Sequence, residues 1–220
     1  GYYSKAPDFN FLFPNYTNVL STDEFVNEKV IGFELGYGFN SRYFHANVNG
    51  YYTMWQDKSL LSRAYASGGQ DIRSFITGLD ATHMGIEVEA MAHVTDVFDI
   101  GILASIGDWE WTNDVQAIVT DDQTFQQDTT NVYSEGLKVG GAPQTQLCLK
   151  LQYNPFQRIN LGTEIIYYDD FYADFDPADR DDPNDREQAW KTPSWVMTNF
   201  YAAYNFKFAG IGSQFTLNIY

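Results

Sequence analysis

The sequence holds a single cysteine, Cys148, and only three histidines among 220 residues. One cysteine excludes a disulfide within the chain and a metal site built from several thiolates. Basic side chains are also scarce, with 13 Lys and Arg against 29 Asp and Glu and a formal net charge of −16. Because a surface of this sign repels phosphate, nucleic acid is excluded as an expected partner. Nothing in this composition leads us to expect a metal or another cofactor.

Long apolar runs are absent as well. No stretch approaches the roughly 18 apolar residues that a transmembrane helix needs. A membrane protein that crosses with strands remains open, because barrel strands carry a weaker sequence signal. The chain does not begin with Met and shows no signal peptide. Residues 1–4 resemble the interior of a longer sequence, so we expect a segment of a longer protein.

The stretch 144–172 alternates between apolar and polar residues with a period of two. The apolar phase of its first half consists of Leu147, Leu149, Leu151 and Tyr153. Turn residues at 154–158 interrupt the pattern, and the alternation resumes at Ile159. This predicts a β-hairpin with one apolar and one polar face. A soluble sandwich would turn the apolar face inward, whereas a membrane barrel turns it outward into lipid.

The same alternation predicts eight strands along the chain, at about 29–40, 43–56, 82–92, 97–110, 144–153, 159–168, 194–208 and after 212. Residues 1–27 are expected to form a loop with a short strand at its start. The connections alternate strictly between short and long, and the long ones, 57–80, 111–142 and 173–193, are expected to be polar loops. In an up-and-down sheet this gathers all long loops at one end. We therefore predict an all-β, antiparallel up-and-down transmembrane β-barrel.

The aromatic residues gather at the predicted strand ends. Every tryptophan falls where a strand meets a long connection: Trp55, Trp109, Trp111, Trp190 and Trp195. A second set lies at the short turns: Phe39, Tyr43, Phe98, Phe156 and Phe208. Two such sets predict aromatic belts at the two membrane–water interfaces.

The polar phase of the strands is expected to face away from lipid. A cation that faces the bilayer midplane costs roughly 2–4 kcal/mol, and a carboxylate somewhat less, so a polar lumen removes a large penalty. So many polar positions indicate a wet or protein-filled interior. The side chains expected to face the lumen or a plug are Glu34, Asn47, Glu87, Glu89, Lys150 and Glu164.

No residue pattern indicates catalysis, since Ser134 and His83 lack a nucleophile motif, and we do not expect an enzyme. The acidic connection 173–193 lacks the spacing of a calcium loop and is expected to be solvated. Four aromatic residues near the loop end are candidate ligand contacts, although an interfacial belt would explain them equally: Trp109, Trp111, Tyr172 and Trp190. The substrate is not readable from these residues, although acidic loops disfavour a strongly anionic ligand.

Four segments give the chain a family resemblance. Residues 1–7, GYYSKAP, are similar to a "GY-S-R-A-P" segment, with Lys5 where Arg is usual. Residues 27–36 are similar to a "P-E-K…Y-E-L-G" stretch, and residues 85–90, GIEVEA, to "G-V-E-L-E-A". Residues 215–219, FTLNI, are similar to the strand before an "N-L-F" motif. In this order, the segments resemble the C-terminal part of the barrel of TonB-dependent outer-membrane receptors.

The resemblance implies a barrel of 22 strands closed by an N-terminal plug domain. Residues 1–220 would then be about eight strands of that single barrel domain, without the plug and the barrel termini. Tyr220 falls on the polar phase, so we expect at least one further closing strand. The implied function is import of a specific nutrient, such as a siderophore, vitamin or carbohydrate, across the outer membrane of a Gram-negative bacterium. The implied partners are the lipid bilayer, the plug and, through it, the TonB complex.

Two other functions remain open at this point. A passive porin-type channel would share the barrel and lack the plug. A soluble β-sandwich binding module would share the alternation and need no detergent.

Overall fold

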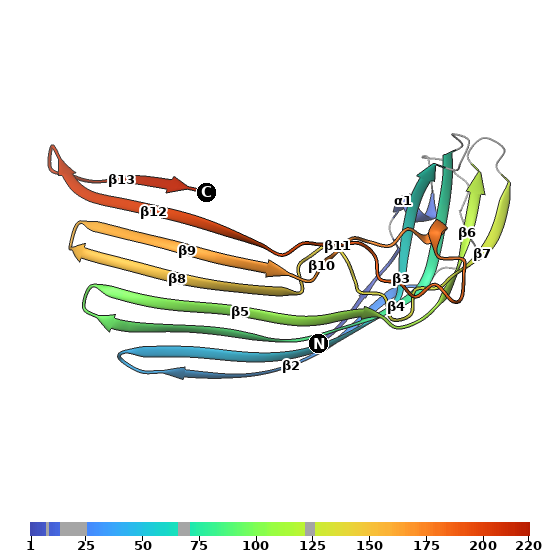
Figure 1. Cartoon of the computed structure of the whole chain (residues 1–220), viewed down its shortest axis with the longest axis horizontal. Coiled ribbons are helices and arrows are strands. Elements are labelled where there is room, and N and C mark those ends of the chain that lie inside the picture. The colour runs from blue at the N-terminus through green and yellow to red at the C-terminus, as the bar shows by residue number, and fades with distance from the viewer. Residues whose placement is uncertain (8, 14–25, 66–70, 122–125) are drawn as a thin grey trace.

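The computed structural model describes residues 1–7, 9–13, 26–65, 71–121 and 126–220, and almost all of its regular structure is strand (Figure 1). Nine strands form one antiparallel path, in the order β1-β2-β3-β4-β5-β8-β9-β12-β13. Their bounds are Tyr2–Lys5, Glu28–Asn40, Phe44–Tyr65, Asp71–Thr95, Phe98–Trp111, Thr145–Phe156, Ile159–Asp169, Trp195–Phe208 and Ile211–Ile219. The eight predicted strands and the short first strand are confirmed.

A short helix, α1 (Phe9–Leu12), follows β1 and was not expected. None of the described helices is both long and apolar enough to cross a membrane.

The short connections all lie at one end of the sheet, on the left in Figure 1, and the long ones lie at the other. We call these the turn end and the loop end. Between β12 and β13, Ala209 and Gly210 have φ angles of 50° and 82°, and positive φ at two successive residues is what a two-residue type I′ hairpin turn requires. Between β8 and β9 the turn is shorter than the expected 154–158, because β8 continues to Phe156. The predicted gathering of the short turns at one end of the sheet is confirmed.

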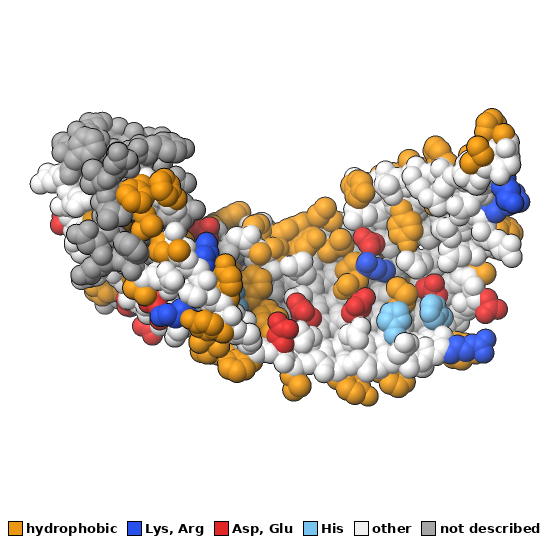
Figure 2. Space-filling view, turned by 180° about the vertical axis from the view of Figure 1, so that it is seen from behind, with side chains coloured by type: hydrophobic (Ala, Val, Ile, Leu, Met, Phe, Trp, Pro, Cys, Tyr) orange, Lys and Arg blue, Asp and Glu red, His pale blue; other side chains and the backbone are white. Residues whose placement is uncertain are grey.

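The register places the two side-chain phases on opposite faces. Asn47 lies opposite Glu89, and Lys150 opposite Glu164, on what we call the polar face. The hollowed face in Figure 2 carries acidic, basic and histidine side chains over the long strands. On the apolar face, Leu35 is 84% exposed and Ile102 is 50% exposed. A soluble sandwich would cover such a face, so its exposure fits contact with lipid.

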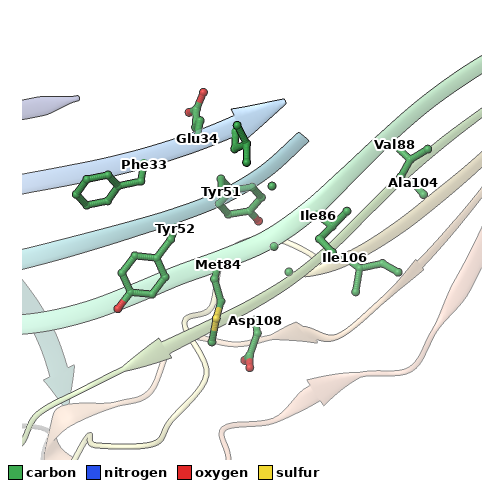
Figure 3. A pocket seen from close by; sticks show the side chains of 14 residues that line it. Phe33, Glu34, Tyr51, Tyr52, Met84, Ile86, Val88, Ala104, Ile106 and Asp108 are labelled. Carbon is green, nitrogen blue, oxygen red and sulfur yellow. The ribbon is translucent and has the colours of Figure 1, made fainter. Parts of the chain in front are cut away.

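The apolar face also contains a depression of about 770 Å³ around Gly50 (Figure 3). Gly50 leaves a gap in this face because its cross-strand partners, Leu35 and Ile86, are large. Figure 3 shows that Glu34 points to the other side of β2 from Phe33. Neighbouring residues of one strand thus meet opposite environments.

The apolar face has a defined height. On β5 it runs from Phe98 to Ile106, about nine residues, which is the length that a tilted strand needs to cross a bilayer. The next residue on the same face, Asp108, is charged. We call the part between Phe98 and Ile106, with the rows paired to it, the membrane band. Everything beyond Asp108 lies outside it, at the loop end.

Beyond the membrane band the sheet continues, and the expected polar loops are largely wrong. Residues 58–65 and 71–80 extend β3 and β4, while two further strands, β6 (Val115–Asp121) and β7 (Gln127–Val132), add to the edge of β4. The pattern changes here because the register shifts on both sides of Lys58, where Asp57 adopts a φ of 58°. Residues 66–70 and 122–125 lie outside the described part of the chain.

The third long connection comes closer to the expected loop. It contains only a 3-10 turn at Pro177–Asp179 and the strand β11 (Lys191–Thr192), which pairs with β10 (Phe171–Tyr172). We call the structure beyond the membrane band, formed by the extended β3 and β4, β6, β7 and residues 133–143 and 171–192, the outer cap.

The buried hydrophobic cluster lies in the outer cap and not in the long sheet. Its members are less than a tenth exposed: Ile76, Leu79, Ala81, Trp111, Ala117, Val132, Leu137 and Val139. The cap therefore has the inward-facing core of a water-soluble protein, whereas the sheet below it exposes its apolar face.

We expect the two faces of the sheet to differ in lipid contact in the full protein. Nitroxide labels at Leu149, Ile102 and Val88 should collide with lipid-dissolved oxygen. Labels at Lys150, Glu87 and Asn47 should not, because they lie on the opposite face. Collision rates measured by electron paramagnetic resonance in liposomes would test this, and equal oxygen accessibility on both faces would contradict it.

We also expect the outer cap to depend on its core. Leu137 is fully buried, so Leu137→Ala should lower the local unfolding free energy by about 2–5 kcal/mol. Amide hydrogen exchange in β6 and β7 should then quicken by at least about 30-fold. The matched control, Ile102→Ala on the exposed apolar face, should leave that exchange unchanged. Protection that survives the Leu137 substitution would show that the cluster does not hold the cap.

Candidate functional site

The polar face brings together all six residues expected on the lumen side. Lys150 and Glu164 form an ion pair with 3.0 Å between Nζ and Oε1. The other four make no side-chain hydrogen bond or ion pair with another described residue: Glu34, Asn47, Glu87 and Glu89. Their polar groups are therefore available to water, to another part of the protein or to a ligand.

A depression of about 500 Å³ lies on this face between β3 and β9. Its lining includes Asn49, Glu87, Ser105, Gln146 and Tyr168, which lie side by side across five strands. The register thus assembles one row of polar groups from residues far apart in the sequence.

The expected tryptophan belt is wrong at the loop end. Trp109 lies opposite His83, and Trp195 opposite Tyr168, in the same phase as Glu87. Trp55 shares that phase, as does Trp111. These four tryptophans therefore lie on the polar face, where an indole N–H can find an acceptor. The Trp109 indole N–H donates to the Tyr51 hydroxyl at 3.0 Å.

At the turn end the aromatic residues agree better with a belt. Phe39, Phe98 and Phe208 all belong to the apolar phase. Phe208 is 72% exposed at its strand end. Aromatic side chains in this position fit the membrane–water interface.

The four candidate ligand aromatics separate into different environments. Trp111 is only 4% exposed and packs edge-on against Phe175, 6.0 Å between ring centroids. This burial removes it from the ligand candidates, because the loop-end core covers it. Tyr172 and Trp190 lie at the β10–β11 hairpin, where the Ala173 N–H donates to the Trp190 carbonyl. Trp109 lies apart from them, on the polar face.

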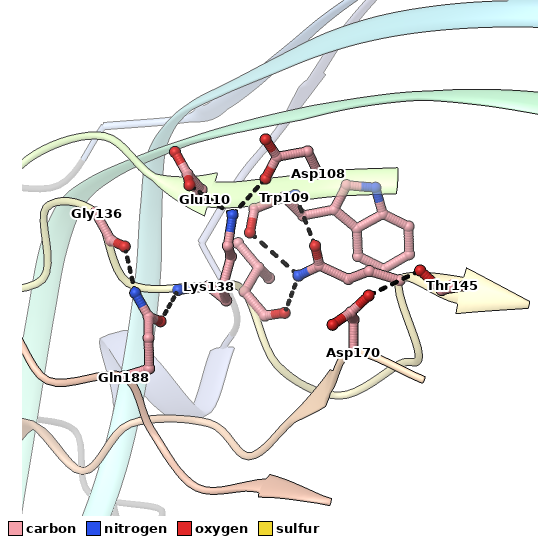
Figure 4. A network of polar contacts seen from close by, with 10 residues as sticks. Asp108, Trp109, Glu110, Gly136, Lys138, Thr145, Asp170 and Gln188 are labelled. Atoms are coloured by element: carbon pink, nitrogen blue, oxygen red, sulfur yellow. Dashed lines mark hydrogen bonds and ion pairs between the residues drawn. The ribbon is translucent and has the colours of Figure 1, made fainter. Parts of the chain in front are cut away.

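Gln144 joins the outer cap to the long sheet through hydrogen bonds to Val139 and to Trp109, which is labelled in Figure 4. Gln144 is 2% exposed and lies one residue before the start of β8. Its side chain continues the hydrogen bonding along β5 at this point. Its Oε1 accepts from the Trp109 N–H at 2.9 Å, and its Nε2 donates to the carbonyls of Trp109 and Val139 at 3.2 and 3.1 Å. The amide side chain therefore takes the place of a backbone partner beside β5.

Lys138 makes a second junction between the cap and β5. Its Nζ lies 2.5 Å from Asp108 and 2.6 Å from Glu110. Burial lowers the pKa of Lys138, but the two carboxylates outweigh it and hold that pKa above its ordinary value. Gln188 encloses the same turn, accepting from the Lys138 N–H and donating to the Gly136 carbonyl, both at 2.8 Å. No periodic pattern in the sequence marks these contacts.

The acidic connection 173–193 is fastened to the cap by ion pairs. The Arg186 guanidinium holds Asp114 through two hydrogen bonds of 2.7 Å. This contact lowers the pKa of the Asp114 carboxyl. Lys191 binds Asp170 and Asp169, whose carboxylates raise its pKa. Among the described residues, no group of three His, Cys, Asp or Glu side chains is placed to hold a metal ion.

The Arg186–Asp114 contact should be sensitive to acid. Because the pKa of Asp114 is depressed in the folded state, its stabilising effect is present above the ordinary value of 3.8 and is lost as the pH falls through the folded pKa. A spin label at Ala189, in a Cys148→Ser background, should be immobile at pH 7 and become mobile only as the pH falls below 3.8, through the lowered pKa of Asp114. Asp114→Asn should make it mobile already at pH 7.

The matched control is Glu187→Gln, which removes a nearby carboxylate whose side chain makes no hydrogen bond or ion pair with a described residue. It should leave the label immobile at pH 7. An immobile label in Asp114→Asn at pH 7 would show that this ion pair does not hold the segment.

Comparison with known proteins agrees with this architecture. The solved structure of a protein named "Copper transporter OprC" superposes with a TM-score of 0.60 at 18% identity, over 93% of this chain. The matched part is 28% of that protein's chain, so the present chain spans less than a third of its length. No curated protein matches the sequence. The sequence model of a family described as "TonB dependent receptor-like, beta-barrel" matches residues 1–220, and the chain therefore belongs to the TonB-dependent receptor family.

Proposed function

We propose that the protein containing this chain imports a specific small-molecule nutrient across the outer membrane, using energy delivered by TonB. The observation that carries the proposal is a sheet with an exposed apolar face, a polar opposite face and all long connections at one end. Such a sheet separates lipid from a polar interior. It also carries a large folded surface, the outer cap, at its loop end only. Family membership supports the coupling to TonB.

In this proposal the polar face lines the lumen. Glu89, Asn47, Lys150 and Glu164 lie within the height of the membrane band and would contact a plug domain of the same protein. The ion pair of Lys150 with Glu164 leaves Glu87 and Glu89 as unpaired charges at this height, and Glu89, the one further from the loop end, fits a cationic partner on the plug. The outer cap, with Tyr172 and Trp190, would form the surface that first meets the ligand.

The transported nutrient does not follow from the similar structure. That protein is named as a copper transporter, but an identity of 18% shows a shared fold alone. The described residues also lack a cluster of metal-binding side chains. Copper is therefore not carried over to this chain.

Growth on a limiting nutrient tests the proposal in the organism that carries the full gene. High-affinity uptake should be lost when the receptor gene is deleted, and equally when TonB is removed, because both are needed for active import. Uptake should also saturate with concentration. Uptake that persists without TonB and rises linearly with concentration would instead establish a passive channel.

A further inference from the structure

Two aromatic rings lie close to the backbone of the polar face at the upper edge of the membrane band. A Cβ atom added at Gly85 would come within 2.5 Å of the Tyr51 hydroxyl, and one at Gly107 within 2.7 Å of the Trp109 indole nitrogen. Only glycine allows rings to approach the wall so closely. The hydrogen bond from Trp109 to Tyr51 ties the two rings together. We call this pair of rings the aromatic floor.

Neighbouring side chains hold the aromatic floor in place. The His83 ring lies between Trp55 and Trp109, with centroids 4.9 and 5.5 Å away. The Trp109 backbone is fixed by the side chain of Gln144. A rigid, preorganised aromatic surface loses little freedom when a ligand binds to it.

Three side chains of the polar row that adjoins the floor have no polar partner among the described residues. Asn49, Glu87 and Ser105 are paired across β3, β4 and β5. Their side chains make no hydrogen bond or ion pair with another described residue. Glu34 lies beside Tyr51 on the neighbouring strand and is equally free. These carboxylates accept hydrogen bonds, so a ligand must bring donors to satisfy them.

A second aromatic pair lies at the β9 end of this row. Tyr168 and Trp195 stack with centroids 5.0 Å apart and an interplanar angle of 24°. Tyr168 also lines the depression that contains Asn49, Glu87 and Ser105. It lies two strands from β5, which is about 10 Å at the usual strand spacing. The polar row therefore has the aromatic floor along its loop side, over β3 to β5, and the Tyr168–Trp195 pair at its β9 end. We call the row with these two aromatic surfaces the strip.

The charge of the strip selects among ligands. Glu34 and Glu87 are unpaired, so an anionic ligand is repelled. A metal ion lacks the converging ligands it needs among the described residues. A neutral molecule with many hydroxyl groups and apolar ring faces fits both the polar row and the aromatic surfaces. Its hydroxyls bind the polar row, and its ring faces stack on the aromatic floor and on the Tyr168–Trp195 pair.

We propose that the strip from Tyr51 and Trp109 to Tyr168 and Trp195 binds a neutral oligosaccharide. The proposal rests on the proposed import function and names its substrate class. It assigns Glu34 and Glu87, at the upper edge of the wall, to the ligand, and leaves Glu89 and the residues below it to the plug.

The test is binding of maltohexaose, cellohexaose and xylohexaose to the purified full-length receptor, measured by calorimetry. Hexagalacturonate serves as the anionic comparison. At least one neutral hexasaccharide should bind, and hexagalacturonate should bind at least about tenfold more weakly than that sugar. Gly107→Ala should weaken binding at least about tenfold by pushing Trp109 off the wall, and Glu87→Gln should weaken it by removing a strong acceptor.

Gly212→Ala is the matched control, because a Cβ there meets open space and its φ is not positive. It should bind the sugar as the unchanged protein does. Surface labelling should find all three variants in the outer membrane in equal amounts. If no neutral hexasaccharide binds, or if neither Gly107→Ala nor Glu87→Gln weakens binding, the proposal is wrong. TonB-dependent uptake of the limiting nutrient is measured separately. Its presence would leave the import function intact even if the oligosaccharide proposal is wrong, and its absence would contradict the import function itself.

Discussion

The structure depends on the pairing of every backbone N–H and C=O within the membrane band. Hydrocarbon offers no water to satisfy these groups, so each spanning strand must pair with a neighbour on both sides. From β3 to β9 the long sheet meets this demand, because each of these strands pairs with a neighbour on both sides. Once the ladder is fixed, side chains can only alternate between two faces, and a slip of one residue would exchange them. The register that pairs Asn49 with Glu87 therefore also decides that Val48 and Val88 lie together on the apolar face.

Outside the membrane band water becomes available, and apolar side chains turn inward instead of outward. At Asp57 the backbone takes a left-handed conformation and the register of β3 against β4 shifts. Beyond that point Ile76 and Leu79 turn inward to a buried cluster, as in a soluble domain. The ion pairs of Lys138 and Arg186 then hold the segments that enclose this cluster. One sheet thus carries two opposite hydrophobic arrangements along its length.

The membrane strands could be predicted because the bilayer imposes one simple period on them. The pattern of Leu147, Leu149 and Leu151 expresses that single constraint, and it located both strand and face. The strands β6 and β7 were missed because each face of the cap meets a local neighbour, so no common period marks them. The tryptophans were assigned to a lipid-facing belt because only their position near the strand ends was considered. Which of the two alternating phases of the strand they belong to was not considered. Trp109 and Trp195 share the phase of Glu87, which the sequence alone already contains.

The outer cap and the polar face of the long sheet meet at Trp109. This contact couples a movement of the cap to the polar face. The Gln144 side chain fixes the Trp109 backbone and also binds the Val139 carbonyl within the cap. The Trp109 ring in turn lies on Gly107 and binds Tyr51 on the wall. Because a packed ring cannot shift without disturbing its neighbours, a displacement of residues 137–144 must reach the polar face through it. The outer cap and the polar face are thereby linked through one side chain that the register places between them.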